Sequence, residues 1–384
     1  MFRRLTGLLC LSKISRRARF RTATAFAIWI VALGPTAAST ESEPARPARK
    51  VAPSSEDATQ AVTEETEVER KKSSRSSPPP PLGVRFGEPL EGQKFRVAYS
   101  FSRELRKGLL IGDRHRSPQN VLANSYNPYD RTPESLEVSV HTLQLAYAPH
   151  PRVTLVIEVP FVRKELETRD EFGAHSQVQT QGIGDIGFAL VVPFILKGSE
   201  SSHFHLGFNA PTGSIRRGGD NSRLPFDSQI GNGTFNLEWG WTYRGEMDWL
   251  SWGGQAVGWH PIGRNDLRYR EGSRFETSIW SAIRLPAGFS ASLRLAWHKR
   301  NNTRVPDGQF IVDPSDPEAI DDPSDNPKTR GGTRLSVSPG LALDLPQLGN
   351  QRIAIEIGIP VHQDLDGPQL KQDWTFKVGW QWGF

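Results

Sequence analysis

The chain has 384 residues, of which 36% are hydrophobic, 23% are charged and 9% are aromatic, and its only cysteine is Cys10. One cysteine excludes a disulfide framework and a four-cysteine metal site. The first 38 residues hold seven Lys or Arg and no acid, so the formal charge of +5 leaves −2 for the remainder. We therefore expect no nucleic acid partner. A mean hydropathy of −0.48, with no second apolar run of about 20 residues, excludes a polytopic helical membrane protein.

Residues 1–38 are predicted to be an export signal peptide. A long basic region precedes the apolar stretch 25–33, and the small residues Thr36, Ala37 and Ala38 follow it. This order is typical of a secretory signal. The apolar stretch is short for a bilayer span, although an uncleaved helical anchor is the alternative.

Residues 39–90 are predicted to be a disordered periplasmic linker. No aromatic residue occurs from Ser39 to Gly83, and the stretch contains four consecutive prolines, Pro78–Pro81. Such a composition cannot bury enough apolar surface to offset chain entropy. The prolines favour a stiff, extended spacer. A tether with affinity for the cell wall is an alternative to a plain linker.

Residues 91–384 are predicted to form an all-β domain, a closed antiparallel transmembrane β-barrel of about 12 strands. In 374–384 the aromatic and apolar residues occupy one parity and the small or polar residues the other, which places them on opposite faces of a strand. Twelve such runs begin near Lys94, Glu137, Val153, Gly182, Ser202, Thr234, Trp252, Ser273, Phe289, Gly332, Gln351 and Asp373. An even number suits closure of an antiparallel bacterial barrel.

Two of the twelve runs are weak. The second run shifts phase around His141, which predicts a β-bulge. The seventh run is diluted by Gly253, Gly254 and Gly258.

Connections between the runs alternate in length. The short connections are 148–152, 197–201, 245–250, 286–288 and 346–350, and the long ones are 106–133, 164–181, 211–233, 261–272, 301–330 and 362–372. A soluble β-sandwich, the alternative fold, has no reason to sort loops by strand end. An outer-membrane barrel does, because short turns face the periplasm and long loops face outside. Both ends of the barrel domain are then expected in the periplasm.

The inward parity carries four acidic and four basic residues, which are candidates for lining a pore. A charge facing lipid at mid-depth would cost about 2–4 kcal/mol for Arg or Lys, so these side chains are expected to point inward. Two interpretations remain open: the charges form a polar constriction that admits small solutes, or they pair across strands and close a narrow lumen. The eight residues are Arg96, Glu158, Glu238, Glu276, Arg284, Arg294, Glu356 and Lys377.

Two clusters are candidates for metal sites. His203 and His205 share one inward face and are weak candidates, but no third ligand is identifiable, so we expect no metal and no cofactor. The acidic loop 313–325 has the oxygen ligands that calcium prefers but lacks a tight glycine turn. A solvated external loop is the favoured interpretation.

No catalytic site is predicted. Some outer-membrane barrels hydrolyse lipids with Ser and His on their outer face, but His205, His298 and His362 fall on the inward parity. His141, in the phase-shifted run, is ambiguous. No Ser–His pair with a positioned acid is identifiable, so a lipid hydrolase is kept only as an alternative.

Several motifs resemble a known family. They are 182–188 (GIGDIGF), 208–214 (FNAPTGS), 233–237 (GTFNL), 252–256 (WGGQA), 360–370 (PVHQDLDGPQL) and 379–384 (GWQWGF). They are similar to an outer-membrane transporter family labelled as phenol-degradation meta-pathway proteins. The resemblance covers most of residues 94–384 and implies an outer-membrane barrel, but it brings no agreed substrate and no catalytic residues.

The expected function is passive transport of small polar or aromatic molecules across a Gram-negative-type outer membrane. The expected partners are outer-membrane lipid, a small-molecule solute and the barrel-assembly machinery, for which Trp380, Trp382 and Phe384 are the predicted C-terminal assembly signal. The alternative is a barrel with a closed lumen that acts as a structural or binding scaffold.

Overall fold

The computed structural model describes residues 77–90, 94–122, 129–197, 199–218, 223–306 and 322–384. The predicted signal peptide (1–38) and the linker as far as residue 76 lie outside the described residues. Among the residues that are described, no helix is both long and apolar enough to cross a membrane.

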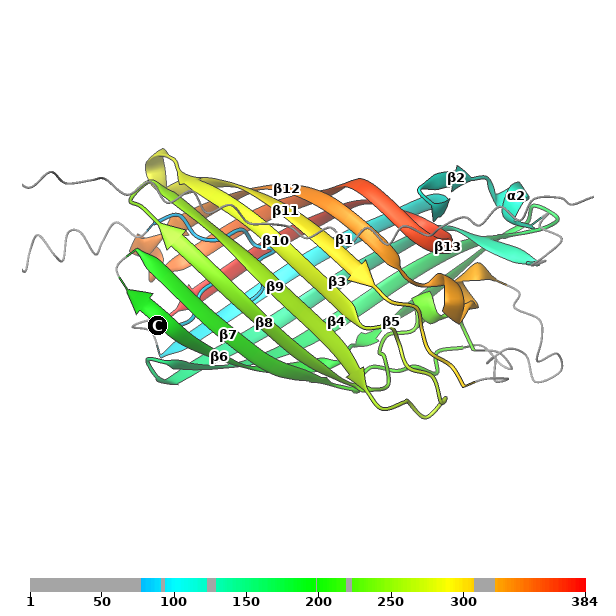
Figure 1. The fold of residues 1–384 in the computed structure, drawn as a ribbon, viewed down its shortest axis with the longest axis horizontal. Coiled ribbons are helices and arrows are strands. Elements are labelled where there is room, and N and C mark those ends of the chain that lie inside the picture. The colour runs from blue at the N-terminus through cyan, green and yellow to red at the C-terminus, as the bar shows by residue number, and fades with distance from the viewer. Residues whose placement is uncertain (1–76, 91–93, 123–128, 198, 219–222, 307–321) are drawn as a thin grey trace, which may run out of the picture. The chain divides into compact units, whose positions relative to one another are not determined.

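The described residues form one antiparallel β-sheet that closes on itself as a barrel (Figure 1). Its strands slant across the barrel wall, as closure of a cylinder requires. Two further strands attach to the ring: β2 (Arg114–Arg116) pairs with β1, and β5 (His175–Ile183) pairs with β4. The eleven strands that close the ring in this part of the chain are β1 (Phe95–Gly112), β3 (Arg131–His150), β4 (Val153–Asp170), β6 (Ile186–Lys197), β7 (Glu200–Ala210), β8 (Phe235–Glu246), β9 (Leu250–Ile262), β10 (Arg274–Arg284), β11 (Phe289–Arg300), β12 (Gly332–Leu345) and β13 (Gln351–Gly383).

The two halves of β13 form two neighbouring strands of the wall. Residues 351–365 pair with β12 and residues 365–383 pair with β1, both antiparallel. The chain must therefore reverse within β13, and its two halves lie side by side, since Trp380 Nε1 donates to Gln351 Oε1 at 2.8 Å. β5 and β6 follow one another along the same side of β4 and together occupy one strand position in the wall. With β13 counted as two strands, the twelve predicted runs thus correspond to twelve strand positions.

The two rims of the barrel differ, as predicted. At one rim, here the short-turn rim, the strands are joined by tight connections such as 151–152, η2 (Pro286–Gly288) and η5 (Pro346–Leu348). Longer segments, containing α2 (Pro118–Leu122), η1 (Phe226–Ser228), η3 (Pro323–Asp325) and η4 (Pro327–Thr329), lie at the long-loop rim. Two expected long loops, 164–181 and 362–372, are instead mostly strand, because β4, β5 and β13 continue to a tight reversal.

Alternation separates an apolar outer face from a polar inner face. In the first half of β13 the side chains of Ile353, Ile355 and Ile357 are exposed on the outside, whereas Glu356 is 2% exposed. Large exposed apolar side chains recur in this way on every long strand of the ring except β9 and β12, where Ile262 and Leu341 respectively are the only such residues. This face suits lipid, because a belt of this size facing water would be unfavourable.

The predicted bulge at His141 is wrong. β3 pairs with β1 without a register shift from Ser135 to Tyr147, and His141 faces outward, with Nδ1 2.6 Å from Tyr99 Oη. The phase shift arises because Leu136 and Val138 point inward near the long-loop rim. There they join an apolar cluster with Leu109, Val121, Tyr129, Leu166 and Leu370.

The glycines of the seventh run make room for neighbouring rings. Gly253 pairs with Trp280, and Gly258 pairs with Trp239. A Cβ at either position would collide with the partner's indole ring. A strand without side chains at these points therefore lets large rings pack flat against it.

Candidate functional site

Part of the predicted linker lies inside the barrel lumen. Residues 77–90, here called the inner segment, lie inside the barrel at the short-turn rim (Figure 1) and contact β4, β8, β9, β11 and β13. These strands lie around much of the ring, so a segment that touches them all is enclosed by the wall. The predicted linker boundary at residue 90 is therefore wrong.

The tip of the inner segment is a turn. Val84 N donates to Pro81 O at 3.0 Å, and Gly83 N donates to Glu356 Oε2 on β13 at 2.9 Å. A Cβ on Gly83 would collide with Arg294 and Glu356. Only glycine brings the backbone this close to the wall.

Apolar contacts hold the returning part of the inner segment. Phe86 and Leu90 are 8% and 2% exposed and pack against Ala146, Val156 and Val191 of β3, β4 and β6. Burial of these two side chains stabilises the inner segment inside the barrel, although the proline run before them offers few apolar side chains to bury. Phe86 and Leu90 are the sequence signal that separates this segment from the linker before it.

Ion pairs add to these contacts. Glu88 accepts from Arg352 at 2.7 Å and from Arg244 at 3.2 Å. Arg85 binds Glu158 on β4 at 2.6 Å and also binds Glu238 on β8. Gln255 of β9 adds two hydrogen bonds to the backbone of Arg85, at 2.9 Å and 2.6 Å.

The structure brings most of the eight predicted pore-lining residues into the lumen, many of them already paired. Arg294 bridges Glu276 at 3.0 Å and Glu356 at 2.7 Å. Arg96 donates to the backbone oxygen of Glu88 at 3.0 Å.

Three of the eight, Arg96, Arg284 and Lys377, make no ion pair with any described residue. Lys377 lines the lumen cavity. Arg284 is half-buried at the last residue of β10, at the short-turn rim. Arg284 therefore does not join the others in the middle of the lumen.

The histidines are placed as follows. His203 and His205 are buried on the inner face, and His205 Nε2 lies 3.4 Å from Glu238 Oε1. Within the described ranges, no group of three His, Cys, Asp or Glu could hold a metal ion. His298 points inward to Glu276 at 3.1 Å. His362 is exposed beside a register shift at 335–336, so its predicted inward orientation is wrong.

A cavity of about 560 Å³ lies in the lumen beside the inner segment. Its wall comes from β1, β3, β4, β6, β7, β9, β10, β13 and the inner segment, and its lining includes many polar or charged residues. Charged residues on it include Arg85, Glu158, Arg274, Glu276 and Lys377. A space of this size matches ordinary small-molecule sites, which have volumes of about 300–1,000 Å³.

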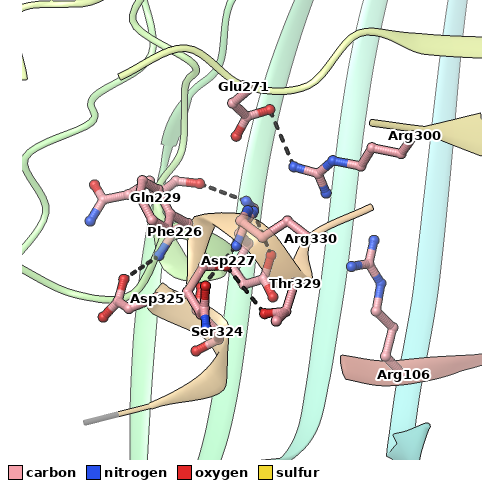
Figure 2. A network of polar contacts seen from close by, with 12 residues as sticks. Arg106, Phe226, Asp227, Gln229, Glu271, Arg300, Ser324, Asp325, Thr329 and Arg330 are labelled. Carbon is pink, nitrogen blue, oxygen red and sulfur yellow. Dashed lines mark hydrogen bonds and ion pairs between the residues drawn. The ribbon is translucent and has the colours of Figure 1, made fainter. Parts of the chain in front are cut away.

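A second layer, here called the cap, crosses the long-loop rim and consists of residues 223–229 and 322–331. Figure 2 shows its centre, where Arg330 reaches Asp227 at 3.0 Å and Ser324 O at 2.9 Å. Lys164 of β4 donates to Gln229 O at 2.6 Å. Arg106 of β1 and Arg300 of β11 flank the same network. Strand β4 is thereby bonded to the cap, and β1 and β11 place further cations beside it.

Burial sets the protonation of the cap carboxyls. Burial raises the pKa of Asp322 to about 7 and that of Asp325 to about 6, although Ser324 and Arg223 partly oppose the shifts. Burial alone would also raise the pKa of Asp227, but Arg330 and Arg106 hold it well below its usual range. The cap thus contains a fixed anion beside two carboxyls that titrate near neutral pH.

The prediction of a solvated acidic loop needs correction at its end. Asp322 is 2% exposed, and its Oδ1 accepts from Ser324 N at 2.7 Å. Asp325 accepts from Phe226 N at 3.2 Å and pairs with Arg223 at 3.3 Å. These contacts fold the end of the loop into the cap, whereas residues 307–321 lie outside the described residues.

No family model and no curated protein matches the chain. Among solved structures, it is similar to an outer membrane channel from Pseudomonas putida F1, with 13% identity, a TM-score of 0.53, and 79% of this chain and 100% of that chain covered. The chain has the fold of an outer-membrane β-barrel. Its apolar outer face agrees with a location in the outer membrane.

Two further similarities are weaker. A Pseudomonas aeruginosa FadL homologue shows 10% identity and a TM-score of 0.39, with 76% of this chain and 91% of that chain covered. A variant of the monoaromatic hydrocarbon channel TodX shows 8% identity and a TM-score of 0.40, with 77% and 91% covered.

Proposed function

We propose that this chain is an outer-membrane channel that gives small polar or aromatic molecules a passive route, and that the inner segment and the cap close it. The observation that carries the proposal is the cavity of about 560 Å³ with a charged lining inside a closed barrel. A lumen filled only for stability would not need to leave such a space, because protein interiors pack with few voids. The sequence resemblance to the phenol-degradation transporter family makes aromatic acids the first solutes to test.

The inner segment supplies the test. We expect a variant that lacks residues 77–90 to give a larger single-channel conductance in planar bilayers than the intact chain. We also expect liposomes containing it to swell faster in sugars and aromatic acids. A variant that lacks residues 60–73 removes the same length of chain from the sequence before the inner segment and should behave like the intact chain.

A scaffold with a permanently closed lumen is the second candidate, and the many contacts of the inner segment favour it. Silence of both deletion variants in the conductance and swelling assays, with the barrel still folded, would overturn the channel and leave the scaffold. A lipid hydrolase has less support, because the outward His141 contacts Tyr99 and Phe101. We expect no turnover of a fluorescent phospholipid above that of empty vesicles.

The assembly signal stays a prediction. Phe384 exchanges two backbone hydrogen bonds of 2.9 Å with Phe95, where β1 meets β13. Its ring stacks on Phe95 and lies tilted against Trp382. These contacts give the final aromatic residues a place in the closing seam of the wall, which is consistent with a role in assembly.

A further inference from the structure

The guanidinium of Arg85 sits in a pocket of the barrel wall. Its Nη2 lies 2.6 Å from Glu158 Oε2 and 2.9 Å from Glu238 Oε2, and its Nε also donates to Glu238. Glu238 is therefore bound through two parallel bonds, the arrangement that a guanidinium makes and an ammonium cannot. The guanidinium also lies 4.5 Å from the centre of the Phe86 ring.

The barrel wall, rather than the inner segment, builds this pocket. Glu158 comes from β4 and Glu238 from β8, and β6 and β7 separate these strands. Gln144 of β3 donates to Glu158 Oε1 at 2.9 Å and fixes its orientation. His205 supports Glu238 from behind, and it fits there because Gly240 has no side chain to displace its ring.

The pocket carries more negative charge than its occupant neutralises. Two carboxylates face one guanidinium, and the side chain of Glu238 is only 2% exposed. A buried carboxylate that loses its partner is strongly unfavourable. If the inner segment leaves the lumen, the pocket therefore requires another cation.

A solute in the lumen can reach the pocket. Arg85 and Glu158 both line the cavity of about 560 Å³, so a molecule that enters the cavity lies beside Glu158 and beside the guanidinium that covers Glu238. The inner segment holds its guanidinium where a guanidinium of such a solute would bind.

We propose that Glu158 and Glu238 form a binding site for small molecules that carry a guanidinium group, and that Arg85 occupies this site as an internal competitor. This inference rests on the proposed channel function and names one class of solute for it. Binding of a guanidinium solute displaces Arg85 and loosens the inner segment. The sequence assigns the two glutamates only to the pore lining.

The full chain with Arg85→Ala tests the proposal, with argininamide as the probe. In detergent, calorimetry should detect argininamide binding to this variant, and binding should weaken by about tenfold or more when Glu158→Gln or Glu238→Gln is added. Glu88→Gln weakens the ion pairs of Glu88 with Arg352 and Arg244 and leaves Arg85 in place, so it serves as the matched control. It should bind the probe more weakly than Arg85→Ala does. Heat-shifted mobility on gels confirms that each barrel is folded.

Planar bilayers provide the second readout. The Arg85→Ala channel should prefer cations in a potassium chloride gradient. Argininamide should block this channel at a lower concentration than it needs to block the double variant Arg85→Ala/Glu238→Gln. If the variant conducts but neither binds argininamide nor changes selectivity with the glutamates, the site is overturned and the channel stands. If it binds argininamide but never conducts, the site stands and the channel fails. In the Arg85→Lys variant the new side chain should compete with argininamide only partly, because an ammonium makes only one of the two parallel bonds to Glu238.

Discussion

Arg294 is a buried cation on the inner face of β11. Its residue exposure is 5%, and it holds both Glu276 and Glu356. Glu356 in turn receives the backbone N–H of Gly83 at the tip of the inner segment. Arg294 of β11 thus connects β10 and β13, and through Glu356 it also connects to the inner segment.

We expect Arg294→Ala to lower the free energy of unfolding by about 3–5 kcal/mol, because it leaves two carboxylates in the lumen without their cation. Urea unfolding in lipid vesicles measures this change. Arg103→Ala is the matched control, since Arg103 and Glu137 form an exposed pair with side chains 48% and 34% exposed, and its loss should cost less than about 1 kcal/mol. Equal effects of the two substitutions would show that the buried pair has no special weight.

The cap is the element whose stability should depend most on pH. Asp322 and Asp325 have pKa values of about 7 and about 6 in the folded chain, above the ordinary value of 3.8. A carboxyl whose pKa is raised by folding favours the folded form below its ordinary pKa, and this contribution is lost as the pH rises to the raised value. The cap should therefore loosen between about pH 4 and pH 7.

Hydrogen exchange of residues 324–331 measures this loosening. After correction for intrinsic rates, we expect exchange to be about tenfold faster at pH 8 than at pH 5. Asp322→Asn removes the ionisation while an amide oxygen can still accept from Ser324, so its exchange should respond much less to pH. A cap in the unchanged chain that is equally protected at both values would contradict the assignment.

The inner segment and the cap differ from the strands in how the sequence encodes them. Alternation along a strand is local, so the parity of Ile353 to Val361 predicts an outward face, which the structure confirms. The inner segment and the cap depend instead on pairs far apart in the chain, such as Arg85 with Glu238 and Asp227 with Arg330. No spacing rule connects such residues, so composition alone assigned the inner segment to a linker.

At the scale of the whole molecule, two environments meet at the barrel wall. The outer face carries exposed Ile, Leu, Phe and Trp side chains, and the inner face carries buried ions. The sequence predicts this division for nearly all runs. It fails near the long-loop rim of β3, where Leu136 and Val138 are inside because an apolar cluster fills that part of the lumen.

The position of a residue within the lipid belt should set the cost of a charge. Ile357 lies in the middle of the first half of β13, and Ile353 lies near its short-turn rim; both face outward. We expect Ile357→Arg to destabilise the barrel by about 2–4 kcal/mol and Ile353→Arg by about 1 kcal/mol or less. Reversible folding into vesicles gives both values, and a reversed order would place the membrane differently on the wall.

The seam between β1 and β13 bears on how the inner segment reaches its place. These strands come from opposite ends of the barrel domain, so the cylinder is complete only after its final stave has paired with its first. Residues 77–90 precede β1 almost directly, and a sheet that is still open leaves them a sideways path onto its concave surface. The segment can therefore be wrapped during biogenesis instead of being threaded through a finished rim. In that case Arg85 meets Glu158 and Glu238 before any solute does.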